Sequence, residues 1–193
     1  MTTYNSVAEI YEAIDETRAR LFDTLEGVDD ARAGFRDAPD RWSVAEVAEH
    51  LALIEGQLAK LFGGLVAKAE AAGAPPAAAD GRIPPVSPDE MIERTRDRIE
   101  APEFVRPAGT AALPESLARL RTSRAALHAL RPRVEALDLS GVRYPHPLFG
   151  PLDIYGWLVF LGLHEERHRR QIEGLLSASR SGEGEKNETA DAG

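Results

Sequence analysis

The sequence contains no cysteine among its 193 residues. Disulfide bonds, zinc sites built from cysteine and cysteine nucleophiles are therefore excluded, and any thiol chemistry must use a thiol from outside the chain. No stretch of the sequence reaches the length of a membrane span, and the first residues show neither a basic leader nor an apolar signal region. We therefore expect a cytoplasmic protein without a membrane partner.

Positive charge is also scarce relative to negative charge, since 23 Lys and Arg stand against 32 Asp and Glu, for a net charge of −9. An acidic protein of this kind is not expected to bind nucleic acid. Hydrophobic residues make up 43% of the chain and charged residues 28%, which is an ordinary globular balance. We expect one domain over residues 1–177, followed by a disordered polar tail over residues 178–193.

Four long segments carry hydrophobic residues at helical spacing and predict an all-α protein. The tetrapeptide Ser-Val-Ala-Glu occurs at residues 6–9 and again at 43–46, and each copy predicts a capping box at the start of a helix. The segment at residues 73–88 holds five prolines, which no helix interior accommodates. These features predict a four-helix bundle with one long crossover connection, and no segment shows a clear strand period. The expected helices span roughly residues 6–27, 43–72, 115–137 and 153–177.

Two histidines, His164 and His168, lie four residues apart on the apolar face of the last predicted helix. Residues at this spacing lie one above the other, so both imidazoles can reach a single ion. The alternative is that both rings are exposed, or are buried and bonded to backbone carbonyls. Because an unpartnered imidazole is costly to bury, a metal is the simplest explanation.

His50 is the predicted third ligand, because it borders the apolar stripe of the second helix. It lies about seven residues, or ~10 Å, after the start of that helix. His168 lies about nine residues, or ~13 Å, before the expected end of the fourth helix. The three imidazoles meet at nearly the same level only if these two helices are antiparallel, so we predict antiparallel packing. Three protein ligands with an open position are typical of catalytic metal sites.

Other residues are candidates for the surroundings of the metal, although no catalytic residue is identified. Glu46 can be a fourth ligand or a general base, but its capping box also accounts for it. Gln171, expected on the buried face, can orient an imidazole or simply bridge two helices. His146, between two prolines, can cover the site or form a turn. Trp42 can line a pocket or belong to the core, and His128 is expected on the surface.

Three segments of the chain together resemble the DinB-like superfamily: residues 41–46 leading to His50, residues 146–152, and His164-x-x-x-His168-x-x-Gln171. The resemblance covers most of residues 6–177. It implies a four-helix bundle with one long crossover and a divalent metal held by three histidines, here His50, His164 and His168. It also implies mixed activities, since that superfamily includes thiol S-transferases or isomerases that use mycothiol or bacillithiol, and proteins described as metal-dependent hydrolases.

The leading functional hypothesis is a metal-dependent enzyme that binds an external low-molecular-weight thiol and directs its thiolate at a small electrophile. The second hypothesis is a hydrolase that uses water at the same metal. The third is a non-catalytic, stress-associated domain in which the metal joins two helices. Zinc or nickel is the expected metal, with iron, copper or manganese as alternatives. The expected partners are a small-molecule substrate and a second copy of the chain in a homodimer.

Overall fold

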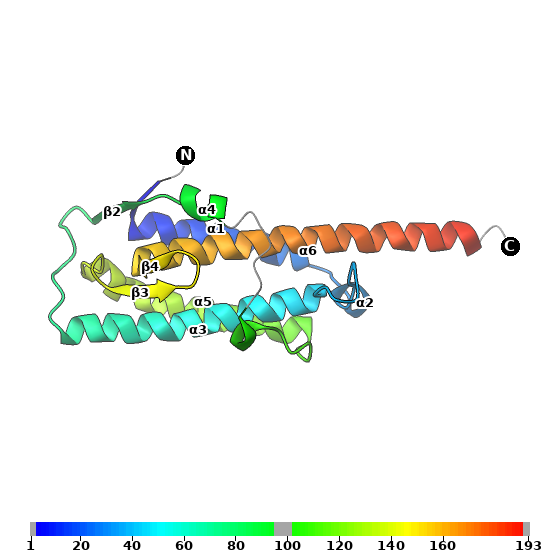
Figure 1. The fold of residues 1–193 in the computed structure, drawn as a ribbon, viewed down its shortest axis with the longest axis horizontal. Helices are drawn as coiled ribbons and strands as arrows, with labels where there is room; N and C mark the ends of the chain where they lie inside the picture. The colour runs from blue at the N-terminus through cyan, green and yellow to red at the C-terminus, as the bar shows by residue number, and fades with distance from the viewer. Residues whose placement is uncertain (1–2, 95–101, 191–193) are drawn as a thin grey trace.

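The computed structural model of the protein describes residues 3–94 and 102–190, and for residue 90 and residues 181–190 it describes the backbone alone. Four long helices dominate this part of the structure (Figure 1). Their bounds are α1 Val7–Leu25, α3 Val44–Ala71, α5 Leu113–Ala136 and α6 Ile154–Ala190. Short helical segments lie in the connections: α2 Asp30–Ala33, α4 Asp89–Arg94 and the 3-10 helix η1 Glu103–Val105.

The four long helices form a bundle of two parallel pairs. Helix α1 packs against α6, and α3 packs against α5, with the helices of each pair running in the same direction (Figure 1). Because α3 and α5 are parallel, the chain must return along the bundle between them, and residues 72–112 make that return. Helices α3 and α6 run antiparallel, as predicted. The predicted four-helix bundle with one long crossover is thus confirmed.

Serine caps begin two of the long helices. Ser43 accepts a hydrogen bond from the Glu46 N–H, and the Glu46 carboxylate accepts one from the Ser43 N–H, which completes the predicted capping box. Ser6 likewise accepts from the Glu9 N–H, but the Glu9 carboxylate accepts from the N–H of Asn5. The first capping box was therefore predicted wrongly in its second half. The difference arises at the start of the helix, where Ser6 is also the last residue of a short strand, Tyr4–Ser6.

Two small antiparallel sheets were missed from the sequence. The strands are short and three of the four contain proline, with Pro145 opposite Pro151, so no alternating pattern marks them. Both strands of a two-stranded sheet are edge strands, where proline is tolerated although it has no N–H to donate. Gly150 adopts the left-handed region with φ of 73° where the second hairpin turns back. The pairs are β1 Tyr4–Ser6 with β2 Arg82–Val86, and β3 Arg143–His146 with β4 Gly150–Asp153.

Helix α6 begins as expected, because the Asp153 carboxylate accepts the Gly156 N–H at 2.8 Å. It continues to Ala190, so the predicted end near Ser177 was wrong. The chain beyond Asp153 contains no proline, and glycines alone weaken a helix without stopping it. The domain boundary at residue 177 stays a prediction, and residues 191–193 of the expected tail lie outside the described residues. No described helix is long and apolar enough to cross a lipid bilayer.

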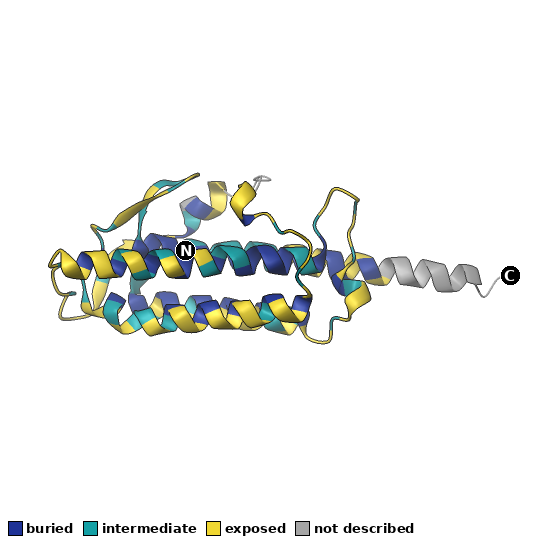
Figure 2. Cartoon of the chain, turned by 90° about the horizontal axis from the view of Figure 1, so that it is seen from below, coloured by how far each residue is buried: buried dark blue, intermediate teal, exposed yellow. Residues whose placement is uncertain are grey.

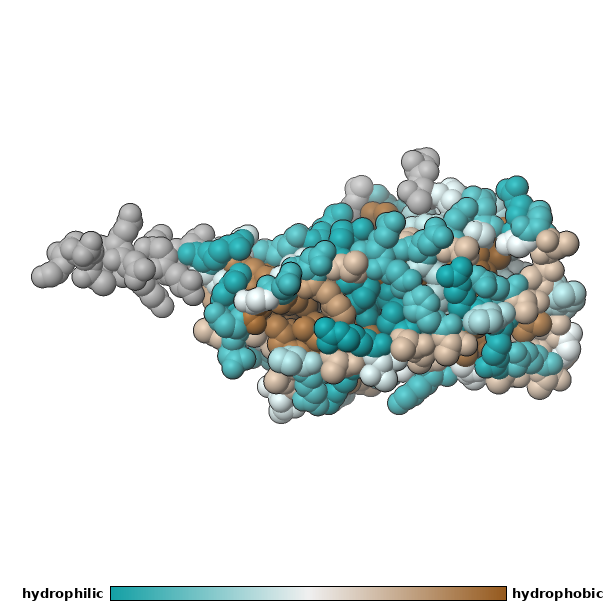
Figure 3. Space-filling model, turned by 180° about the vertical axis from the view of Figure 1, so that it is seen from behind, coloured by the Kyte–Doolittle hydropathy of each residue, from teal (hydrophilic) through white to brown (hydrophobic). Residues whose placement is uncertain are grey.

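The core of the bundle is divided into two hydrophobic clusters along its length. Buried residues lie on the inward faces of the helices (Figure 2), and the rear surface is mostly hydrophilic except near the end from which α6 extends (Figure 3). Between the two clusters, each long helix contributes one buried charged residue. One cluster includes Ile14, Leu58, Leu127 and Leu161, and the other includes Leu21, Leu51, Leu120 and Ile172.

The four charged residues between the clusters, Arg18, Glu55, Arg124 and Glu165, form what we call the buried quartet. Each is at most 7% exposed. Arg18 donates to both carboxylates, with its Nε 2.8 Å from Glu165 Oε1. Arg124 Nη2 lies 3.1 Å from Glu55 Oε2 and 3.0 Å from Glu165 Oε2. The two positive and two negative charges thus compensate one another and join all four helices.

Backbone and hydroxyl groups complete the quartet. Arg18 donates to the carbonyl of Leu120 on α5, and Arg124 donates to the carbonyl of Ile14 on α1. Burial raises the pKa of Glu165, although the neighbouring arginines act in the opposite direction. Burying charges is expensive, so the quartet contributes little net stability by itself, but removing one partner leaves the others uncompensated.

We predict that Glu55→Gln lowers the free energy of unfolding by about 3–5 kcal/mol, because it removes one charge from this buried network. Urea denaturation measures the effect. Glu70→Gln is the control, since Glu70 forms an ion pair with Arg133 at the half-exposed end of the same helix. A loss for Glu55→Gln no larger than that of the control would contradict the prediction.

Candidate metal centre

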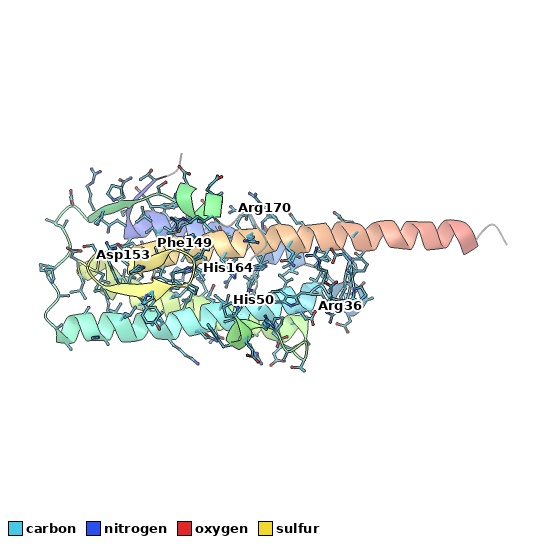
Figure 4. All side chains as sticks on the ribbon, viewed as in Figure 1. Arg36, His50, Phe149, Asp153, His164 and Arg170 are labelled. Atoms are coloured by element: carbon cyan, nitrogen blue, oxygen red, sulfur yellow. The ribbon has the colours of Figure 1, made fainter. Side chains whose placement is uncertain are left out.

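Three imidazoles converge from two helices at the middle of the bundle. His50 comes from α3 and His164 from α6 (Figure 4). His168 comes from the next turn of α6. The Nε2 atoms of His50 and His164 are 3.4 Å apart. One ligand atom from each of the three rings lies within 4.8 Å of the others. The antiparallel packing of α3 and α6 brings these predicted ligands to the same level.

The outer nitrogen of the His50 ring is held by the crossover. Its Nδ1 lies 2.7 Å from the carbonyl oxygen of Val105, the last residue of η1. A carbonyl only accepts hydrogen bonds, so Nδ1 carries the proton and Nε2 presents its lone pair toward the other two histidines. This arrangement is typical of metal-binding histidine, whose second nitrogen donates to a carbonyl or a carboxylate.

Gln171 holds the ring of His168 in the same way, with its Oε1 2.8 Å from His168 Nδ1. The side chain of Gln171 is exposed, so its expected place on the buried face was wrong. Its position one turn after His168 accounts for the contact. His164 differs from the other two rings, because its Nδ1 is buried and has no hydrogen-bond partner in the described structure.

All three rings are held neutral by their surroundings. Burial lowers the pKa of His50 and outweighs the hydrogen bond to Val105. Burial and the neighbouring His168 and His50 place the pKa of His164 well below its usual value. For His168, burial and His50 lower the pKa to about 3, even though Gln171 acts in the opposite direction. Neutral imidazoles have a free lone pair, which is the form that binds metals.

The three rings fit a divalent transition metal. Two nitrogens bound at ~2.0–2.1 Å with tetrahedral angles are ~3.4 Å apart, which matches the separation between His50 and His164. Without a cation between them, these close nitrogens have only one weak mutual contact, and the buried Nδ1 of His164 has none. An all-imidazole donor set suits zinc, nickel, copper or iron.

Trp42 and Glu46 lie beside the three histidines but have different roles. The Trp42 ring is 4.7 Å from that of His50 and 6.4 Å from that of His168, so it borders the group. The Glu46 carboxylate is bound by Ser43 and by Arg36, and it is not part of the metal-binding group. Burial acts to raise the pKa of Glu46, but these hydrogen bonds outweigh it and the net shift is downward. The geometry agrees with the capping interpretation.

His146 lies in the hairpin of β3 and β4, apart from the metal-binding group. Its ring packs against Phe149, Trp157 and Phe160, with centroid distances of 4.3–4.7 Å. Its Nδ1 accepts hydrogen bonds from the backbone N–H groups of Leu148 and Phe149. The proton of a neutral ring is therefore on Nε2. Burial lowers the pKa of His146 to about 4. His128 is half-exposed and is bonded to Asp15. It is not part of the metal-binding group.

Two residues that support His50 were missed from the sequence. The Val105 carbonyl leaves no signal, since every residue carries one. Glu49 is 5% exposed and accepts hydrogen bonds from the backbone of the crossover. Glu49 directly precedes the predicted ligand His50. A charged residue so close to a predicted buried ligand was the one sign in the sequence that Glu49 supports His50.

The comparison with protein families is consistent with this geometry. The model of the DinB superfamily matches residues 13–172, which include His50, His164 and His168. The chain belongs to the DinB superfamily. The resemblance stated from the sequence motifs is thus confirmed.

Two individual proteins resemble this DinB chain. The uncharacterized protein YuaE of Bacillus subtilis (strain 168) is 26% identical over 160 residues, which cover 82% of this chain and 92% of YuaE. The crystal structure of TT2238, a four-helix bundle protein, matches with a TM-score of 0.58 and 23% identity, covering 86% of this chain and 98% of TT2238. At this identity the likeness to TT2238 shows the fold alone.

We predict that His164→Ala abolishes stoichiometric zinc binding, because two imidazoles are too few ligands for a stable site. Elemental analysis of protein purified without a nickel column measures the zinc content. His128→Ala is the matched control, since it removes an imidazole that is bonded to Asp15. Equal zinc content in both variants would show that the ion binds elsewhere.

Proposed function

We propose that this DinB protein is a divalent-metal-dependent enzyme that joins an external low-molecular-weight thiol to a small electrophile. His50, His164 and His168 would hold the ion, with zinc or nickel as the expected metal. When bound, the ion would supply a Lewis acid that lowers the pKa of a thiol or water at its open position.

The number of ligands is the observation that carries this proposal. Within the described residues, the metal-binding group holds three imidazoles and no fourth His, Asp or Glu. Structural zinc sites normally have four protein ligands, whereas catalytic sites have three and an open position. The candidate fourth ligand Glu46 is already engaged by Ser43 and Arg36. The ligand set therefore supports catalysis over a purely structural metal.

The residues around the group orient the rings and provide apolar walls. Val105 and Gln171 fix the rings of His50 and His168, so that their lone pairs point to one place. Trp42 borders the group on one side, and Phe160, with its ring 5.5 Å from that of His164, borders it on another. Aromatic walls of this kind would contact the apolar body of a small substrate.

In the proposed reaction, a carbon–sulfur bond forms between the thiol and the substrate. The leaving group departs with its bonding electron pair, and the proton of the thiol passes to solvent. The sulfur comes from outside the chain, because the chain has no cysteine. Hydrolysis at the same ligands and a non-catalytic metal-binding role are the alternatives. A homodimer, a cytoplasmic location and the lack of a nucleic-acid partner stay predictions from the sequence.

We predict that EDTA-treated protein loses thiol-transfer activity and that added zinc restores it. The assay follows the coupling of glutathione, mycothiol or bacillithiol to 1-chloro-2,4-dinitrobenzene. A product that forms without any thiol would indicate hydrolysis instead. A zinc-loaded protein that is inactive with every thiol and electrophile would favour the non-catalytic role.

We further predict that His146→Phe lowers kcat/KM by ~10-fold, the usual effect of losing one hydrogen bond to a substrate, while the zinc content stays unchanged. Backbone N–H groups occupy the Nδ1 of His146, which leaves Nε2 as the donor of a neutral ring, and the ring packs against Phe160 beside His164. Phenylalanine preserves the packing but removes the donor. An unchanged kcat/KM would show that His146 only packs within the hairpin and does not contact the substrate.

A further inference from the structure

The crossover segment at residues 104–109 is fastened to α3 around His50. Glu49 accepts hydrogen bonds from the N–H groups of Ala108 at 3.3 Å and of Gly109 at 3.0 Å, one on each carboxylate oxygen. Two turns further along α3, Gln57 donates to the carbonyl of Phe104 at 3.3 Å. The segment between these attachments includes Val105, whose carbonyl accepts from His50.

The fit of this segment against α3 is close. Gly109 has a φ of +71°, and a Cβ at this position would lie 2.9 Å from Glu46 Oε1. Only glycine combines that backbone conformation with this approach. Glu49 itself is 5% exposed, and Val105 is 4% exposed. Burying a carboxylate is costly unless its oxygens accept hydrogen bonds. Both oxygens of Glu49 accept backbone N–H groups of the crossover, which indicates that Glu49 holds this segment in place.

We propose that Glu49 is a positioning residue for the metal site, acting through the crossover. It holds Ala108 and Gly109, which places the carbonyl of Val105, which in turn fixes the ring of His50 with Nε2 facing the other two histidines. This inference rests on the proposed metal-binding role of the three histidines. By linkage, zinc binding and the attachment of residues 104–109 strengthen each other.

The test measures zinc affinity of the full-length protein by competition with a chromophoric chelator. Glu49→Gln keeps the shape of the side chain, but its amide can accept only one of the two N–H groups. We expect zinc affinity to fall by ~10–100-fold, the range for partners that orient metal ligands. Gly109→Ala disturbs the same segment directly, because the added Cβ would meet Glu46, and it should act in the same direction. Val66→Ala, a core change near the opposite end of α3 from Glu49, is the control for general loss of stability.

A second readout separates positioning from a merely structural role. Amide hydrogen exchange at Ala108 and Gly109 should slow when zinc is added to the wild type, and should be fast in Glu49→Gln. If the wild type binds zinc and Glu49→Gln binds it equally well, the inference is wrong while the proposed function stands. If the wild type itself binds no zinc, the proposed function is wrong and the inference falls with it.

Discussion

The buried quartet sets the register on which the rest of the bundle depends. Hydrophobic clusters above and below it tolerate small shifts of one helix along another, but paired charges do not, since a shift leaves a charge buried without its partner. Arg18 and Arg124 bridge Glu55 on α3 to Glu165 on α6. The level of α3 relative to α6 is thereby fixed by ion pairs that come from the other two helices.

That register has a direct consequence for the metal centre. His164 directly precedes Glu165 on α6, and His50 lies five residues before Glu55 on α3. The quartet therefore aligns the two helices within about two turns of the imidazoles. Residues outside this layer orient the imidazole rings. Val105 in the crossover fixes the ring of His50, and Gln171 on α6 fixes the ring of His168. The long crossover is thus part of the site as well as a connection between parallel helices.

Most of the fold followed from local signals in the sequence. Serine caps, helical periodicity and the proline-rich segment predicted the helices and the crossover. The antiparallel packing of α3 and α6 was also predicted correctly, although the depth of His168 was measured from an expected helix end near Ser177 that was wrong. The quartet was not predicted, because Arg18 and Glu55 each interrupt an apolar stripe as charged residues usually do on a surface. Their pairing becomes visible only when all four helices are in register. The prediction that Gln171 is buried failed for a related reason. Helical periodicity shows which face of the helix Gln171 lies on, but it does not show whether a neighbouring helix covers that part of the face.

Family membership and the ligand set constrain the chemistry in different ways. The DinB superfamily match, together with the likeness to TT2238, accounts for the fold, and folds of this kind host more than one reaction. The ligand set is more specific, because three neutral nitrogen donors and no thiolate leave a divalent ion with most of its positive charge. Such an ion would act as a Lewis acid on the ligand in its open position and would lower the pKa of a thiol or of water there. Because the chain has no cysteine to compete for the ion, the thiol of the proposed reaction would have to come from solution.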